Sequence, residues 1–148
     1  MTPRRPHRAD PGAPVDGVEY LFVYGTLRRG FRTPMHPLLD RYATYCGRGS
    51  VRGVLFDLGA YPGLHREDGG KRAVTGELYR LDHPARLLPR LDRYEGCGRH
   101  MRRPSEYIRE VLPVEPENGA PVRAWVYLYN RPLRGARRIH SGDYRHRR

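Results

Sequence analysis

Apolar residues along the chain fall into short runs, and five of these runs have the composition and spacing of β-strands. They lie at residues 21–24, 50–58, 74–81, 109–114 and 122–129. The last two flank a tip that contains Asn118-Gly119, a dipeptide typical of hairpin turns. A glycine follows the first run and the sequence GAYPG follows the second, so we expect both strands to end in turns.

Two further segments carry apolar residues at helical spacing. Between Pro34 and Tyr45, two leucines and a tyrosine share one face, which predicts a short helix. Between His83 and Tyr94, a proline in the first turn and three leucines on one face predict a second helix. Pro89 lies inside this segment and removes one main-chain hydrogen bond, so we expect the second helix to be kinked or divided into two pieces.

These elements predict an α+β fold in which a small mixed sheet curls into a β-barrel flanked by short helices. With 148 residues, the chain is long enough for one such domain and too short for two. Residues 1–17 contain four prolines, two glycines and no apolar period, and we expect them to form a disordered tail. The predicted domain covers residues 18–144, and residues 145–148 form a basic C-terminal end.

The formal net charge of +12 raises the question of nucleic-acid binding. Half of this charge lies near the end of the chain, where residues 131–148 contain seven arginines and one aspartate. Only Lys71 among the 28 basic residues is a lysine, a bias that genome base composition explains more simply than phosphate recognition. We therefore expect loose, salt-sensitive association with polyanions and no specific nucleic-acid partner.

Composition also argues against several other classes of protein. No apolar run approaches 18 residues and the N-terminus lacks the apolar core of a signal peptide, so we expect no membrane contact and a cytoplasmic location. The two cysteines, Cys46 and Cys97, form no CxxC pair, and the seven histidines show no metal-ligand spacing, so no metal site is predicted. A packed or exposed thiol explains Cys97 better than a nucleophile does, because no histidine has a motif-supported place beside it.

Two short segments carry residues that could perform chemistry. Tyr24-Gly25-Thr26-Leu27 is a strand end followed by a glycine turn. It forms either an ordinary tight turn or a cradle of backbone N–H groups for an anion. Glu95 directly follows the apolar face of the second predicted helix. It is either a solvated residue at the helix end or a base that points into a pocket.

Seven short motifs occur in order along the chain. They are YGTLRRG at 24–30, AYPGL at 60–64, VTGELYRLD at 74–82, LDRYEG at 91–96, YIR with a following valine at 107–111, AWVYLY at 124–129 and IHSGDY at 139–144. In order and spacing these motifs resemble the γ-glutamylcyclotransferase-like family, also called AIG2-like. Each motif alone is unremarkable, but together they make the resemblance specific over about 120 residues.

The resemblance implies a β-barrel with flanking helices and an enzyme that releases 5-oxoproline from γ-glutamyl compounds. In this reaction the α-amine of the substrate attacks its own γ-carbonyl, and neither water nor a cofactor is consumed. Glu95 matches the acid/base position of the family, and Tyr24, Gly25, Thr26 and Leu27 match the loop that grips the γ-glutamyl group. Tyr107 matches an aromatic position near the substrate.

The chain departs from the family pattern in the link between Gly96 and Tyr107, which is longer and arginine-rich. This link either recognises an acidic leaving group or is a solvated insertion. The alternative functions are a γ-glutamylamine cyclotransferase, which the sequence Glu-Gly-Cys at 95–97 slightly favours, and a small-molecule binding protein without turnover. The expected partner is a small γ-glutamyl compound, and we expect a monomer or a homodimer.

Overall fold

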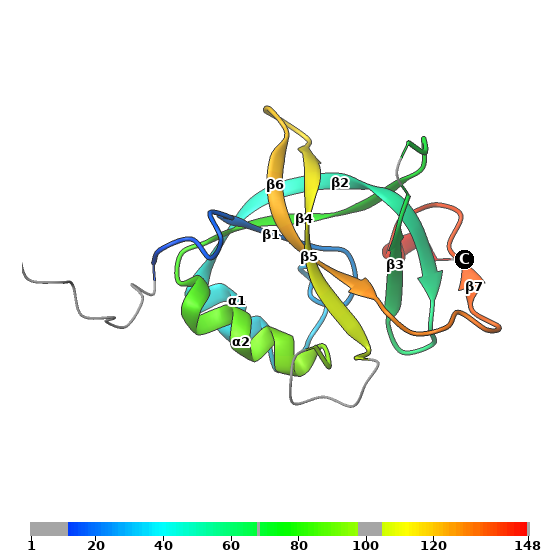
Figure 1. The fold of residues 1–148 in the computed structure, drawn as a ribbon, viewed down its shortest axis with the longest axis horizontal. Helices are drawn as coiled ribbons and strands as arrows, with labels where there is room; N and C mark the ends of the chain where they lie inside the picture. Colours follow the sequence, from blue (N-terminus) through cyan, green and yellow to red (C-terminus); the bar gives the residue numbers. More distant parts are fainter. Residues whose placement is uncertain (1–11, 68, 98–104, 148) are drawn as a thin grey trace, which may run out of the picture.

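Five strands form a closed barrel in the computed structural model of the chain, which describes residues 12–67, 69–97 and 105–147 (Figure 1). They are β1 (Tyr20–Val23), β2 (Ala43–Asp57), β4 (Ala73–Leu81), β5 (Tyr107–Pro116) and β6 (Val122–Tyr129). The strand order is β2-β4-β1-β6-β5, and β5 pairs back onto β2 through Gly49 and Ser50 to close the ring. Only the β1–β6 pair is parallel within this ring. The predicted mixed barrel is confirmed.

Two short strands extend the sheet beyond the barrel, and sequence analysis missed both. They are β3 (Pro62–Arg66) and β7 (Arg137–Arg138), and each pairs with the second half of β2. In the sequence, β3 begins with Pro-Gly and has no alternating pattern, so it was expected to be part of a turn. Its strand structure comes from pairing with β2, in which Leu55 lies opposite Leu64.

Two helices, α1 (His36–Tyr42) and α2 (Pro84–Tyr94), lie side by side against one side of the barrel (Figure 1). Their contact with the sheet is apolar, because Leu39 of α1 and Leu87 and Leu91 of α2 are completely buried. The first helix is shorter than predicted. The chain turns to an extended conformation at Ala43 and enters β2, whose pairing with β4 begins there.

Pro89 does not divide the second helix. One continuous α-helix runs from Pro84 to Tyr94 with Pro89 inside it, so the expectation of a helix in two pieces is wrong, while the alternative of a kink stays a prediction. The proline removes a single hydrogen bond, while the buried residues Leu87, Leu88 and Leu91 lie on both sides of it. Their burial stabilises the helix by more than the missing bond destabilises it.

The strand β1 separates two apolar clusters. Leu21 and Val23 pack with the helices, whereas Phe22 between them packs with the cluster that includes Val51 and Val126. Because both faces of β1 are buried, the strand is held firmly in the core. The position at which the following turn begins is therefore well defined.

Most of the predicted N-terminal tail lies outside the described residues, so its disorder stays a prediction there. Val15 pairs with Val18 in an isolated bridge and packs on the core, so contact with the domain begins before residue 18. Within the ranges that the structure describes, no helix is long and apolar enough to cross a membrane.

Candidate active site

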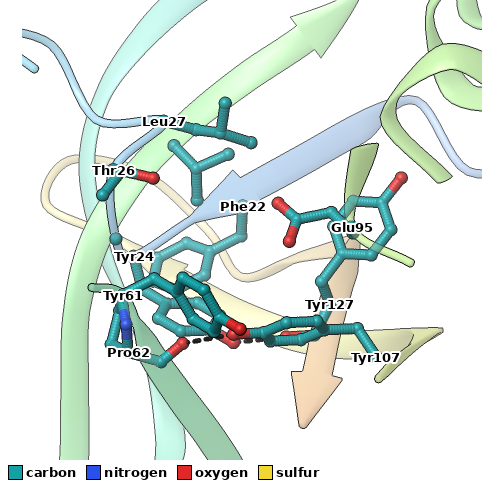
Figure 2. Close-up of a pocket in the computed structure, with 11 residues that line it drawn as sticks. Phe22, Tyr24, Thr26, Leu27, Tyr61, Pro62, Glu95, Tyr107 and Tyr127 are labelled. Carbon is teal, nitrogen blue, oxygen red and sulfur yellow. Dashed lines mark hydrogen bonds between the residues drawn. The ribbon is translucent and has the colours of Figure 1, made fainter. Parts of the chain in front are cut away.

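A cavity lies where β1 ends, between the turn that follows it, the end of α2 and the start of β5 (Figure 2). It is lined by Phe22, Val23, Tyr24, Gly25, Thr26, Leu27, Tyr61, Pro62, Glu95, Tyr107 and Tyr127. All six site residues predicted from the sequence are among them. Segments more than 80 residues apart in the chain therefore contribute to one cavity.

The cavity has a narrow inner part and a wider outer recess. The inner part has a volume of about 40 Å³, and the adjoining recess has about 250 Å³. Four residues line both of them: Thr26, Tyr61, Glu95 and Tyr107. The outer recess is also lined by Tyr94 and Glu106. A ligand can therefore place one small group inside while the rest of it occupies the recess.

Gly25 is needed for close approach between two chain segments. A Cβ atom at this position would lie 2.6 Å from Cγ of Pro62, which is closer than packed carbon atoms come. The reason for glycine here is thus the contact with the start of β3, since Gly25 is not among the glycines with positive φ. The structure thus gives a steric reason why a side chain is not tolerated at residue 25.

The side chain of Tyr24 is occupied by contacts within the protein. Its buried hydroxyl donates to the carbonyl oxygen of Tyr127 and accepts from the amide of Leu64 at 3.2 Å. Burial, and then the charge of Glu95, raise its pKa well above the usual value, so the hydroxyl stays protonated. Tyr24 thereby joins β1, β3 and β6 beneath the cavity.

The turn presents backbone donors instead. Its own hydrogen bond runs from the amide of Arg28 to the carbonyl of Gly25 at 3.1 Å. Among the residues that the structure describes, the amides of Thr26 and Leu27 have no hydrogen-bond acceptor. Thr26 and Leu27 both line the cavity, and free N–H groups in a turn are able to bind a carbonyl oxygen or an anion.

Tyr107 also uses its hydroxyl inside the protein. It donates to the carbonyl oxygen of Pro62 at 2.7 Å, and its ring packs edge-on against Tyr129. Burial, together with neighbouring tyrosine and glutamate side chains, raises its pKa far above the usual value. The residue therefore forms a wall of the cavity with its ring and holds β3 against β5 with its hydroxyl.

Glu95 is the C-cap of α2, and Gly96 with φ of +65° turns the chain away after it. The amide of Glu95 still donates to Leu91 at 2.8 Å, and the amide of Cys97 closes the end of the helix on Asp92 at 2.7 Å. The carboxylate points into the cavity, toward the side formed by Thr26 and Leu27 (Figure 2). The solvated alternative for this glutamate is thus not what the structure shows.

The pKa of Glu95 is raised to about 7, first by burial and then by the negative charges of Glu106 and Asp92. No basic side chain and no hydrogen-bond donor in the described ranges contacts its carboxylate. A carboxyl group with this pKa is divided between its two forms near neutral pH, which suits a group that both accepts and returns a proton.

Sequence analysis missed Asp92, which attaches the end of α2 to the barrel. Its carboxylate accepts two hydrogen bonds from Arg109, at 2.7 and 3.1 Å, and a third from the hydroxyl of Tyr127 at 2.6 Å. The guanidinium of Arg109 also lies 4.2 Å from the ring centre of Trp125. The one available signal was that Asp92 precedes Glu95 by three residues, close to one helical turn.

The outer recess has an acidic and aromatic character. The interaction of the Tyr61 hydroxyl with the Glu106 carboxylate, more than burial, raises the pKa of Tyr61 to about 12. Arg131 approaches the same carboxylate at 3.7 Å from a partly exposed position. The arginines of the predicted loop, Arg99, Arg102 and Arg103, lie outside the described residues, so their role stays a prediction.

Two other predicted features of the site can be compared with the structure. Cys97 is partly buried against the apolar cluster that β1 forms with the two helices. Burial, and to a smaller extent the charge of Asp92, raises the pKa of its thiol. A thiol in this state is a poor nucleophile. In the described parts of the chain, no group of three His, Cys, Asp or Glu side chains is placed to hold a metal ion.

Comparison with known proteins gives consistent matches over most of the chain. The profile of the family described as "Gamma-glutamyl cyclotransferase, AIG2-like" matches residues 21–146. The Escherichia coli K12 protein "Gamma-glutamylcyclotransferase family protein YtfP" is 34% identical over 125 residues, which cover 84% of this chain and 94% of that protein. The rat "Gamma-glutamylaminecyclotransferase" is 38% identical over 105 residues, or 66% of this chain and 64% of the rat protein.

A solved structure has the same fold. The crystal structure of a mouse AIG2-like protein superimposes with a TM-score of 0.59 at 33% sequence identity, covering 74% of this chain and 76% of the mouse chain.

Proposed function

The chain belongs to the gamma-glutamyl cyclotransferase, AIG2-like family, and we propose that it releases 5-oxoproline from a γ-glutamyl compound with Glu95 as general acid and base. The observation that carries this proposal is the placement of the Glu95 carboxylate, with its raised pKa, in the same cavity as the free amides of Thr26 and Leu27. One cavity thus offers a proton acceptor and hydrogen-bond donors for an oxygen.

The proposed reaction is an intramolecular acyl transfer. The α-amino nitrogen of the substrate forms a bond to its γ-carbonyl carbon, which closes a five-membered lactam, and the bond from that carbon to the leaving nitrogen breaks. Glu95 takes a proton from the attacking nitrogen and returns one to the leaving amine, so the enzyme ends in its starting state. General acid–base help of this kind contributes about 10²- to 10⁴-fold.

The turn at 24–27 has two tasks in this proposal. The amides of Thr26 and Leu27 bind the γ-carbonyl oxygen and stabilise the negative charge that grows on it. The inner cavity and the adjoining recess together hold the glutamyl chain in the folded conformer that brings amine and carbonyl together. Because both reacting groups belong to one molecule, this positioning is a large part of the work.

A γ-glutamylamine is the second candidate substrate class, and the outer recess favours it. Glu106 and the partly exposed rings of Tyr61 and Tyr94 line the place where the leaving group would lie. Glu106 disfavours a carboxylate on the leaving group, although Arg131 at 3.7 Å offsets part of its charge, whereas an alkyl amine packs on the rings. The identity to the rat protein, named as a γ-glutamylaminecyclotransferase, points the same way.

The test is a panel of γ-glutamyl dipeptides, γ-glutamyl alkylamines and glutathione, with released 5-oxoproline measured by chromatography. Wild-type protein is expected to turn over at least one compound, and Glu95→Gln to be about 10²- to 10⁴-fold slower on it. The matched control is Glu117→Gln, which makes the same chemical change at an exposed residue.

Three results would each change the assignment. A Glu95→Gln variant as fast as wild type would remove Glu95 from the mechanism. Binding of γ-glutamyl compounds by calorimetry without turnover of any of them would identify a binding protein. If Glu106→Gln did not improve activity on carboxylate-bearing leaving groups relative to alkylamines, the outer recess would not select a γ-glutamylamine.

A further inference from the structure

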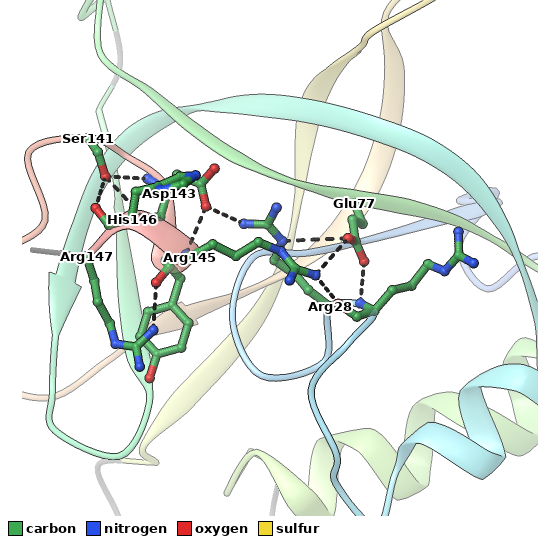
Figure 3. Close-up of polar contacts among 9 residues, drawn as sticks. Arg28, Glu77, Ser141, Asp143, Arg145, His146 and Arg147 are labelled. Carbon is green, nitrogen blue, oxygen red and sulfur yellow. Dashed lines mark hydrogen bonds and ion pairs between the residues drawn. The ribbon is translucent and has the colours of Figure 1, made fainter.

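The turn that lines the cavity continues into a buried arginine. Arg28 follows Leu27 directly, and its side chain is 1% exposed, which makes it the largest fully buried side chain in the described residues. It lies outside the cavity lining and extends to the other side of the turn, toward the C-terminal segment (Figure 3). The turn therefore has the cavity on one side and a buried charge on the other.

Two carboxylates from distant parts of the chain surround this guanidinium. Nη1 of Arg28 donates to Oδ1 of Asp143 at 2.7 Å, and Nε lies 3.7 Å from Oε2 of Glu77 on β4. Their side chains are 20% and 5% exposed, so the network is largely removed from water. In such surroundings, hydrogen bonds between charged groups are strong and their geometry is well defined.

The same network holds the main chain next to Arg28. Oε1 of Glu77 accepts from the backbone amide of Arg29 at 2.7 Å. Arg145 donates to the carbonyl oxygen of Arg29 and lies 3.6 Å from Glu77. Glu77 from β4 and Arg145 from the C-terminal segment, both labelled in Figure 3, thus bind the main chain two residues after Leu27.

The C-terminal segment is itself fixed where it supplies Asp143. The carbonyl oxygen of Gly142 accepts from the amide of Thr75 at 2.8 Å, and a Cβ on Gly142 would lie 2.2 Å from the carbonyl oxygen of Ala73. Asp143 is also the N-cap of the short 3₁₀ helix Tyr144–His146, because its side chain accepts from the amide of Arg145 at 2.9 Å. Asp143 therefore approaches Arg28 from a rigid support.

Stability alone does not account for a buried arginine at this position. An apolar side chain of similar size generally stabilises a core as well as or better than a buried ion pair, because the charges lose their hydration. Nε of Arg28 even lacks a hydrogen-bond partner in the described structure. Unlike an apolar contact, the ion pair has a defined geometry, and it therefore fixes the turn relative to the segment that carries Asp143.

We propose that Arg28 is a positioning residue of the active site, and that Asp143, 115 residues away, completes that site by fixing the turn through it. The proposal rests on the proposed function for its kinetic consequences. Arg28 acts through the backbone of the turn: its anchored side chain sets where the amides of Thr26 and Leu27 lie relative to Glu95. The C-terminal segment is then part of the catalytic apparatus although it does not touch the cavity.

The first test is Asp143→Asn in the full chain. Asparagine keeps the size of the side chain and its ability to cap the 3₁₀ helix, and removes only the charge that holds Arg28. We expect KM for the best substrate of the panel to rise about tenfold and kcat to fall as well, because the same amides bind the γ-carbonyl oxygen and stabilise its charge in the transition state. The pH midpoint set by Glu95 is expected not to shift. Arg28→Lys, which keeps the charge but not the forked geometry, is expected to show the same rise.

Two controls separate positioning from a loss of stability. Asp57→Asn removes a more peripheral ion pair, Asp57 with Arg137, in the same region, and its KM is expected to stay at the wild-type value. Val114→Ala lowers the melting temperature by removing buried apolar contacts inside the barrel while it leaves the ion pairs of Arg28 intact, and its KM is also expected to be unchanged. A wild-type KM in both Asp143→Asn and Arg28→Lys would overturn the proposal.

Hydrogen–deuterium exchange tests the same point without any substrate. In Asp143→Asn, amides of residues 24–31 are expected to exchange faster, while those of β5 and β6 keep their wild-type rates. If wild-type protein released no 5-oxoproline, the proposed function would fail. Faster exchange at residues 24–31 in Asp143→Asn would then still show that Asp143 holds the turn. The positioning role would be overturned if exchange in Asp143→Asn rose equally in all segments or in none. It would also be overturned if Asp143→Asn did not fold and exchange in Arg28→Lys stayed at the wild-type rates.

Discussion

Asp92 and Arg109 form a two-point ion pair, with Oδ1 to Nε at 2.7 Å and Oδ2 to Nη2 at 3.1 Å, which fastens the end of α2 to β5. Glu95 lies three residues beyond Asp92, so the pair sets where its carboxylate enters the cavity. The hydroxyl of Tyr127, which also lines the cavity, binds the same aspartate. The acid at the helix end is therefore held from the barrel side, whereas the turn opposite is held by Arg28.

The first prediction concerns the pH dependence of turnover. Glu95 must be ionised to accept a proton, and its pKa is raised to about 7, so kcat/KM is expected to rise with pH and level off above about 7. Removing a nearby negative charge lowers that pKa, so Glu106→Gln is expected to move the midpoint to lower pH. A pH series on both proteins measures this, and an unmoved midpoint would contradict it.

The second prediction concerns stability. The folded pKa of Glu95 is about 7 and its ordinary value is 4.5, so the folded protein keeps a proton that the unfolded chain releases between these values. Ionisation of Glu95 therefore lowers the free energy of unfolding progressively as the pH rises from 4.5 to 7. Glu95→Gln lacks this penalty. It is expected to gain about 3 kcal/mol over wild type at pH 8 and almost nothing at pH 4.

Urea unfolding of both proteins at the two pH values measures this difference. Comparing variant with wild type cancels the other titrating groups, which are common to both. A gain of equal size at pH 4 and pH 8 would mean that ionisation of Glu95 is not its source.

The third prediction concerns Gly25. Any side chain there collides with Pro62, so Gly25→Val is expected to displace the turn or the start of β3 and to reduce kcat/KM by at least tenfold. A matched control is Gly119→Val at the exposed tip between β5 and β6, where no atom lies within 4 Å of a Cβ, although its positive φ costs some stability. Normal kinetics in Gly25→Val would show that the turn is not part of the site.

The fourth prediction concerns Tyr107, whose hydroxyl is engaged with Pro62. Tyr107→Phe removes this bond and leaves the carbonyl of Pro62 without its donor, at an expected loss of about 1 kcal/mol in unfolding free energy. Because the ring rather than the hydroxyl faces the ligand in our proposal, kcat is expected to stay within about twofold of wild type. A loss of kcat near that of Glu95→Gln would assign the hydroxyl a part in the chemistry.

The local pattern of the sequence located the five barrel strands and both helices, although it began the second strand at residue 50, whereas β2 begins at Ala43. Each of these elements buries an apolar face of its own, so its period is visible in the run of residues that forms it. The same local reading located Glu95 after the apolar face of α2 and the glycine turn after β1. It also led to the family, because motif order is a property of the chain and needs no coordinates.

Only the tertiary structure decided how these pieces meet. The closure of β2 on β5, the strand β3 and the pairing of Arg28 with Asp143 depend on partners far away in the chain, and no local period encodes such a partner. It also gave the roles of Tyr24 and Tyr107, whose hydroxyls bind the protein itself. The pKa of Glu95 belongs here as well, since it follows from burial and from the charges of Glu106 and Asp92, which exist only once α2 has packed against the barrel.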